Sequence, residues 1–106
     1  MMFTEKQILK SILLDFSYDY YDNQIKRIRK EIEEEAYYKN NLDLVIELII
    51  NKKLENDEAL NMVHNIANVA LHDNTEEEAY RWLTLLIINI TKQGSIIQYN
   101  PNNIHK

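Results

Sequence analysis

Histidine and serine are the side chains of this sequence most suited to acid–base, nucleophilic or metal chemistry, because cysteine is absent. His64 and His72 stand eight positions apart, which on one helix separates them by about 12 Å and prevents them from sharing a metal ion. The serines have no histidine within a few positions that could serve as their general base. With Gly94 as the single glycine, the chain has no glycine-rich loop for a phosphate group. We therefore expect no enzyme activity, no metal site and no cofactor.

The segment of residues 15–22 (DFSYDYYD) is the first candidate for binding, because it combines three tyrosines with three aspartates. Tyrosine provides a large contact area at a low entropic cost, and carboxylates can pair with Lys or Arg of a partner. We expect Asp19, Tyr20, Tyr21 and Asp22 to contact a partner protein. The alternative is that the aromatic side chains close the core while the aspartates are solvated in a turn.

A second acidic segment precedes and opens the last expected helix. It contains Asp73, Glu76, Glu77 and Glu78, and these four residues are also expected to contact a partner. The alternative is purely structural, because acidic side chains in the first turn of a helix interact favourably with its dipole. Three consecutive glutamates exceed what capping requires, and they point in different directions around the helix.

Residues 26–30 (KRIRK) form a short basic stretch that four glutamates follow within five residues. A nucleic-acid contact would need a longer basic surface. The spacing instead predicts a solvated helix face, on which Arg27 pairs with Glu31 and Lys30 pairs with Glu34 at i,i+4.

These residues must be positioned by helices, because the single glycine and the single proline both lie in the last thirteen residues. Hydrophobic spacing predicts helices over residues 5–16, 24–38, 42–53, 58–71 and 76–93. Capping boxes are predicted at the start of the first helix (Thr4 with Gln7) and of the last helix (Thr75 with Glu78). A turn is expected over 18–23 and a break at Asn40-Asn41. Gly94 suits the left-handed position that ends the last helix. The helix over 42–53 is apolar around much of its circumference, which predicts that it is well covered.

The predicted fold class is all-α, a compact antiparallel bundle of four to five helices. One domain spans residues 1–94, and residues 95–106 form a short C-terminal tail that is expected to pack back on the bundle through its apolar residues. An alternative is a homodimer formed through the last three helices.

The net charge of −5 disfavours nucleic acid as a partner and favours a basic protein. The charge is concentrated over residues 54–91, where seven acids face one base. No apolar run reaches the roughly 18 residues that a membrane helix needs, and the N-terminal residues do not resemble a secretion signal. The expected location is therefore the cytoplasm, without a membrane partner.

The chain resembles bacterial immunity proteins in its size, acidity and tyrosine content. The residues that carry this resemblance are Asp19-Tyr20-Tyr21-Asp22 and the acidic stretch 73–78. These proteins protect cells from colicins and contact-dependent inhibition toxins. The resemblance implies that the chain binds a cognate basic toxin, a nuclease domain, and blocks its active or substrate-binding site. In the colicin DNase group a proline follows the paired tyrosines, whereas Asp22 follows them here. The competing hypothesis is a small helical adaptor or regulator that acts through homodimerisation or partner binding.

Overall fold

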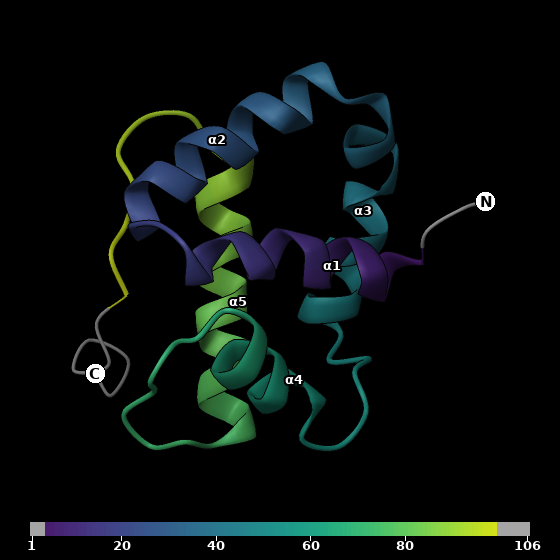
Figure 1. Ribbon diagram of the computed structural model, residues 1–106. Coiled ribbons are helices and arrows are strands. Elements are labelled where there is room, and N and C mark those ends of the chain that lie inside the picture. Colours follow the sequence, from purple (N-terminus) through teal and green to yellow (C-terminus); the bar gives the residue numbers. More distant parts are fainter. Residues whose placement is uncertain (1–3, 100–106) are drawn as a thin grey trace.

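Helical segments separated by polar turns give the protein its secondary structure, which the computed structural model describes for residues 4–99. Within these residues no strand occurs, and the expected all-α class is confirmed (Figure 1). In chain order the elements are α1 (Glu5–Leu14), the 3₁₀ turn η1 (Asp15–Ser17), α2 (Tyr21–Glu34), α3 (Ala36–Ile50), α4 (Glu58–Asn61), the π-helical turn η2 (Met62–Ile66) and α5 (Glu76–Thr91).

The helices cross one another rather than lying in one parallel stack. In Figure 1, α3 descends and α5 ascends, so these two are antiparallel, while α1 lies across them. Helix α1 packs on α3 and on η2, and α2 packs on α3 and α5. The last residues of the described chain run down beside α5, on the side where α2 begins (Figure 1).

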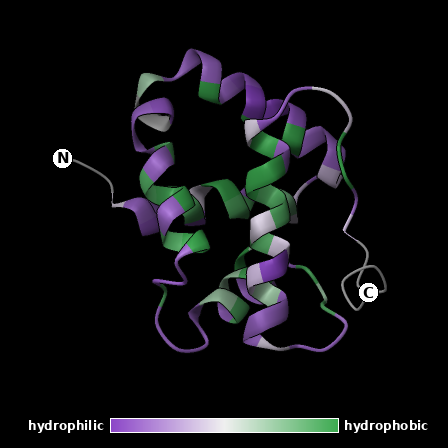
Figure 2. Ribbon diagram, turned by 180° about the vertical axis from the view of Figure 1, so that it is seen from behind, coloured by the Kyte–Doolittle hydropathy of each residue, from purple (hydrophilic) through white to green (hydrophobic). Residues whose placement is uncertain are grey.

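The core combines apolar residues of α1, α2 and α5 with residues of α3, α4 and η2. Apolar colour in Figure 2 is concentrated on α5 and on the helices that cross it, whereas α2 is largely polar on its outer surface. The largest fully buried side chains are Ile8, Leu9, Ile12, Leu13, Ile25, Ile28, Ile49, Met62, Leu83 and Leu86, together with the polar Gln24 and Glu78.

The start of α1 has the predicted capping box. The Thr4 hydroxyl accepts a hydrogen bond from the N–H of Gln7 at 3.2 Å, and Gln7 Oε1 accepts one from the N–H of Thr4 at 2.9 Å. At α5 only half of the predicted box forms. The Thr75 hydroxyl accepts from the N–H of Glu78 at 3.1 Å, but the Glu78 carboxylate bonds to other groups.

Two predicted boundaries near α2 were wrong. The turn after η1 is shorter than expected, because α2 already begins at Tyr21. The break lies at Glu35, whose backbone is extended (φ −103°, ψ 108°), while Asn40 and Asn41 lie inside α3. This break lets α2 lie over α5 and lets α3 descend beside α1, so that each helix buries its own apolar face.

The fourth helix is shorter than its apolar pattern predicted. The helical segment closes at Ala67, because Asn68 adopts a left-handed conformation (φ 58°) that asparagine tolerates better than most residues. The N–H of Val69 then donates to the carbonyl of Val63 at 3.0 Å. Leu71 is still buried, but from the loop before α5.

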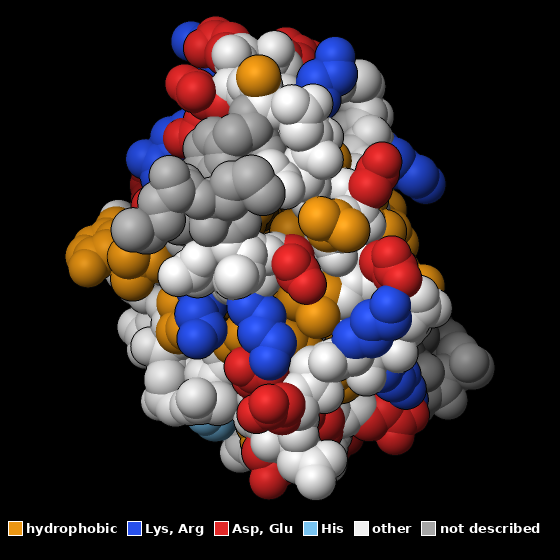
Figure 3. Space-filling view, turned by 90° about the vertical axis from the view of Figure 1, so that its right-hand side faces the viewer, with side chains coloured by type: hydrophobic (Ala, Val, Ile, Leu, Met, Phe, Trp, Pro, Cys, Tyr) orange, Lys and Arg blue, Asp and Glu red, His pale blue; other side chains and the backbone are white. Residues whose placement is uncertain are grey.

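Helix α3 is less covered than its composition predicted. Leu44 is 48% exposed and Ile50 is 54% exposed. Figure 3 shows the side of the molecule that faces right in Figure 1, where apolar side chains lie among interspersed acidic and basic ones. The prediction that this helix is well covered was wrong, because α3 packs against α1, α2 and α5 and leaves Leu44 and Ile50 to solvent.

The end of α5 also differs in detail from the prediction. The helix ends at Thr91 with Lys92 as the C-cap, and Gly94 follows two residues later with φ +97°. The left-handed glycine is therefore confirmed, but it lies in the turn after the helix. Its carbonyl accepts a hydrogen bond from Arg29 Nη1 at 2.9 Å.

Candidate functional site

Residues 18–22 comprise the turn between η1 and α2 and the first two residues of α2, and they present two tyrosines to solvent. Tyr18 is 80% exposed and Tyr20 is 81% exposed. Between them, Asp19 Oδ1 accepts hydrogen bonds from the N–H of Tyr20 at 2.7 Å and from Asn23 Nδ2 at 3.1 Å. The bond from Asn23 and then that from Tyr20 lower the pKa of Asp19. The Asp19 carboxylate thus holds the backbone of Tyr20, while the N–H of Tyr18 donates to the carbonyl of Asp15 at 3.1 Å.

Tyr21, the next residue, points inward and belongs to the core. The centroid of its ring lies 5.4 Å from the ring centroid of Phe16 and 6.0 Å from that of Trp82. The ring centroids of Phe16 and Trp82 are 5.7 Å apart. Its hydroxyl accepts a hydrogen bond from Asn89 Nδ2 at 2.8 Å, and burial raises its pKa. Tyr21 is partly buried, so less of its surface than of the surface of Tyr20 faces solvent, and its contact with a partner stays a prediction.

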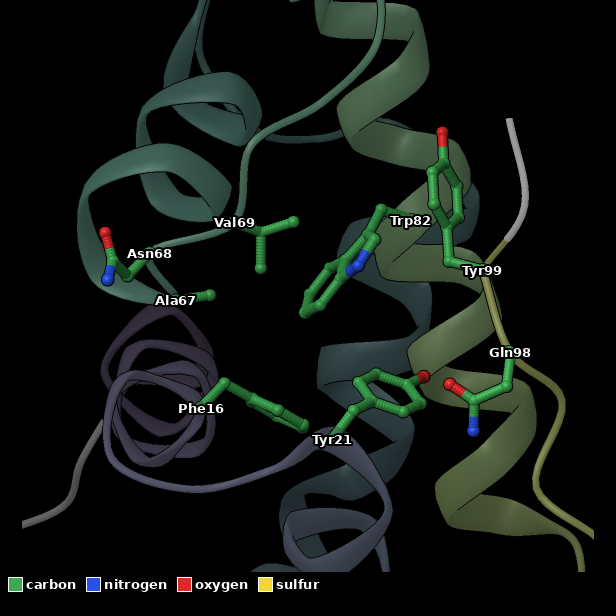
Figure 4. A pocket seen from close by; sticks show the side chains of 8 residues that line it. All are labelled: Phe16, Tyr21, Ala67, Asn68, Val69, Trp82, Gln98 and Tyr99. Carbon is green, nitrogen blue, oxygen red and sulfur yellow. The ribbon is translucent and has the colours of Figure 1, made fainter. Parts of the chain in front are cut away.

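A pocket of about 250 Å³ opens beside this aromatic cluster (Figure 4). It lies where η1, the start of α2, the loop after η2, the middle of α5 and the C-terminal tail meet. Its lining residues are Phe16, Tyr21, Ala67, Asn68, Val69, Trp82, Gln98 and Tyr99. This pocket was not predicted from the sequence, because its walls come from five segments, most of them distant from one another in the sequence.

Glu78 contradicts its expected place on the surface, because it is only 1% exposed. Its carboxylate accepts hydrogen bonds from the N–H of Asp73 at 2.6 Å, the N–H of His72 at 3.3 Å and the hydroxyl of Tyr99 at 2.8 Å. Burial alone would raise the pKa of Glu78, but these bonds outweigh burial and lower it. Glu78 therefore fastens the loop before α5 and the tail, and it is not available to a partner.

The other residues of the acidic segment are partly engaged within the chain. Glu76 Oε1 accepts a hydrogen bond from the N–H of Leu60 at 2.7 Å, which joins α5 to α4. Glu77 is exposed and pairs with Arg81 at 2.7 Å. The carboxylate of Asp73, also exposed, lies 3.7 Å from His72 Nε2. Of the four predicted residues, Asp73 and Glu77 are the two that are exposed.

The C-terminal tail joins the two predicted segments. Buried Asn89 holds it through both amide atoms, since Oδ1 accepts from the N–H of Ile97 and Nδ2 donates to the Ile97 carbonyl, each at 2.9 Å. Gln98 Nε2 donates to Asp22, and Tyr99 donates to Glu78. Packing of the tail on the bundle is confirmed as far as residue 99, while residues 100–106 lie outside the described residues. Asn89 interrupts an otherwise apolar stretch of α5, and this interruption was the available sequence signal for its role.

The basic stretch is largely neutralised within the chain. Arg27 Nη2 lies 2.8 Å from Asp15 Oδ2. The two predicted ion pairs, Arg27–Glu31 and Lys30–Glu34, are both present, each with an N–O distance of 3.9 Å. Arg29 turns inward, where its Nε donates to the carbonyl of Asn89 at 2.8 Å. The expectation of a solvated, internally paired helix face is confirmed for this stretch, with Arg29 as the exception.

Over the described part of the chain, no group of three or more His, Cys, Asp or Glu side chains is arranged to hold a metal ion. His64 instead shares a hydrogen bond of 2.7 Å with Asn74. None of the helices within residues 4–99 combines the length and the apolar composition needed to cross a membrane. The arrangement therefore offers contact surface and a small aromatic pocket as its distinctive features.

Comparison of the chain with protein-family models, with curated proteins and with solved structures found no match.

Proposed function

We propose that this chain is a binding protein that neutralises a basic bacterial toxin, in the manner of an immunity protein, and that residues 18–22 form the centre of its contact surface. The observation that carries the proposal is the pair of exposed tyrosines, Tyr18 and Tyr20, on a turn that Asp19 holds in place. Tyrosine is enriched among the residues that dominate binding energy at protein interfaces. A fixed turn also lowers the entropy lost on binding.

The sign of the charge supports a basic partner. The chain carries a net charge of −5, and hydrogen bonds from Asn23 and Tyr20 lower the pKa of Asp19, which favours its charged form. Asp73 and Glu77 add exposed carboxylates at the start of α5. Such a surface accelerates the approach of a positively charged protein and repels nucleic acid.

Neutralisation of this kind needs no chemistry from the chain. A nuclease carries a positive groove for its substrate, and an acidic surface with projecting tyrosines can cover that groove and exclude the nucleic acid.

The proposal is tested by co-expression with the product of the reading frame immediately upstream in the source genome. We expect that product to be toxic alone, harmless with this chain and recovered with it in a 1:1 complex. The double substitution Tyr18→Ala/Tyr20→Ala should weaken the complex by about 2 kcal/mol or more, which is roughly thirtyfold in Kd, and should reduce the rescue of growth.

The matched control is Leu44→Ala, which also removes an exposed apolar side chain but lies on α3. It should leave binding and rescue unchanged. A harmless neighbour, or a neighbour that does not associate with the chain, would contradict the immunity function. An unchanged Kd for the tyrosine double variant would remove residues 18–22 from the interface.

A second candidate function is that of an adaptor that forms homodimers. The exposed side chains of Leu44 and Ile50 on α3 favour it, because a dimer would cover them. Sedimentation velocity over a hundredfold concentration range distinguishes the two functions. A concentration-dependent dimer that Leu44→Asp abolishes would favour the adaptor, whereas a monomer at all concentrations would exclude it.

A further inference from the structure

The pocket beside α5 is lined by a polar group that makes no hydrogen bond within the described part of the chain, the indole N–H of Trp82. The side chain as a whole is 3% exposed, but its nitrogen is not among the fully buried atoms that lack a partner. In Figure 4 the indole nitrogen lies on the side of the ring that faces Tyr21 and Tyr99, so it points into the pocket. The indole N–H is a donor only, and an occupant of the pocket that supplies an acceptor can bond to it in place of water.

The walls of the pocket restrict what can enter. Phe16, Tyr21 and Tyr99 provide aromatic surface, and Ala67 and Val69 provide aliphatic surface. A planar ring packs well against such walls in an edge-to-face or offset arrangement. The volume of about 250 Å³ lies below the range of roughly 300–1,000 Å³ typical of sites for larger ligands. The pocket therefore suits a single ring.

Charge further limits the occupant. The carboxylate of Glu78 accepts a hydrogen bond from the hydroxyl of Tyr99, which lines the pocket, and its negative charge near that wall disfavours an anion. A cation is disfavoured at the point where the indole N–H presents its positive hydrogen. A neutral ring that carries an oxygen acceptor satisfies both conditions.

We propose that this pocket binds one neutral aromatic ring bearing a hydroxyl oxygen, with that oxygen accepting a hydrogen bond from Trp82 Nε1. This chemistry is found in free phenols and in the tyrosine side chain of a partner protein. The inference goes beyond the proposed function and does not depend on it, since it rests on the geometry of the pocket alone.

The test uses the single tryptophan of the chain, which gives one indole N–H resonance in a ¹H–¹⁵N spectrum. Titration of the whole chain with p-cresol should move this resonance in a saturable manner. Toluene, which has the same ring without the oxygen, should bind at least threefold more weakly and should move the resonance less. The absence of a saturable shift with p-cresol, or equal affinities for both compounds, would overturn the proposal.

Two variants separate pocket binding from weak contact elsewhere on the surface. Val69→Phe should fill the pocket and abolish the shift, whereas Ala70→Phe adds the same ring at a neighbouring exposed position and should leave the shift intact. If Val69→Phe does not fold, as judged by the dispersion of its amide resonances, Ala67→Leu fills the pocket from another wall. Binding that persists in a folded pocket-filling variant would contradict the proposal.

The source of the ring is decided by a second titration. N-acetyl-tyrosinamide, which carries main-chain groups on both sides of the ring, should bind within about threefold of p-cresol if the pocket receives a tyrosine of a partner protein. Binding of p-cresol alone would assign the pocket to a free phenol. Neither result depends on the toxin co-expression experiment, so the two proposals can fail separately.

Discussion

In residues 73–78 the carboxylates of Glu76 and Glu78 accept hydrogen bonds from main-chain N–H groups, whereas in residues 18–22 the side chains of Tyr18 and Tyr20 project into solvent. Both segments are acid-rich, and their sequences alone suggested the same role. The first uses its acids to fasten a loop, α4 and the tail to α5. The second uses Asp19 only to fix its own turn.

The difference indicates how acidic segments of a small helical protein can be distinguished. A carboxylate beside a loop with unpaired N–H groups becomes part of the fold, because those groups need acceptors when they are buried. An aromatic side chain remains available for binding when its turn is already satisfied by a neighbouring polar group. Substitutions in and around the two segments test this difference.

The largest effect is expected for Glu78→Ala. It leaves the N–H groups of His72 and Asp73 and the hydroxyl of Tyr99 without their acceptor, and it should lower the free energy of unfolding by about 3 kcal/mol in urea denaturation. Glu77→Ala is the matched control, because Glu77 is exposed, and it should change stability by less than about 0.5 kcal/mol. Equal effects of the two substitutions would show that Glu78 does not fasten the fold.

A smaller loss, of about 2 kcal/mol, is expected for Asn89→Ala. This substitution removes the bonds from Asn89 to both main-chain groups of Ile97 and to the hydroxyl of Tyr21. The tail should detach, which hydrogen exchange at the amide of Ile97 would report. Thr91→Ala, on the exposed side of the same helix, should leave that exchange rate unchanged. Protection of Ile97 that survives in Asn89→Ala would mean that other contacts hold the tail.

The third expected effect is a dependence on pH. Glu78 has a pKa below its ordinary value of 4.5 in the folded chain, so its stabilising effect is present above that value and is lost as the pH falls through the folded pKa. The wild-type chain should exceed Glu78→Gln in stability by about 1.5 kcal/mol at pH 7. This difference should shrink below about pH 4.5. A difference that stays constant from pH 7 to pH 3 would contradict the assigned role.

Much of the fold could be predicted from the sequence, because its signals are local. The capping box of Thr4 and Gln7 and the apolar stripes of α1 and α5 involve residues within a turn or two of one another. The break at Glu35 has no comparable signal in the residue types around it. The break results from tertiary packing, in which α2 packs on α5 and α3 packs on α1.

The candidate site was less predictable, because its contacts are distant in the sequence. Glu77 and Glu78 are adjacent and identical in type, yet one pairs with Arg81 in solvent and the other is buried under Tyr99. Tyr20 and Tyr21 differ in the same way, since the second meets Trp82. Only the folded arrangement distinguishes the members of each pair.

The most direct test of this account compares Tyr20→Ala with Tyr21→Ala by equilibrium unfolding in urea. The substitutions affect neighbouring residues of the same type, so composition and local propensity are matched. We expect Tyr20→Ala to change the free energy of unfolding by less than about 0.5 kcal/mol and Tyr21→Ala to lower it by about 2 kcal/mol or more, because its ring packs against Phe16 and Trp82. Equal losses for the two variants, or a larger loss for Tyr20→Ala, would contradict the assignment of Tyr20 to a free surface for a partner.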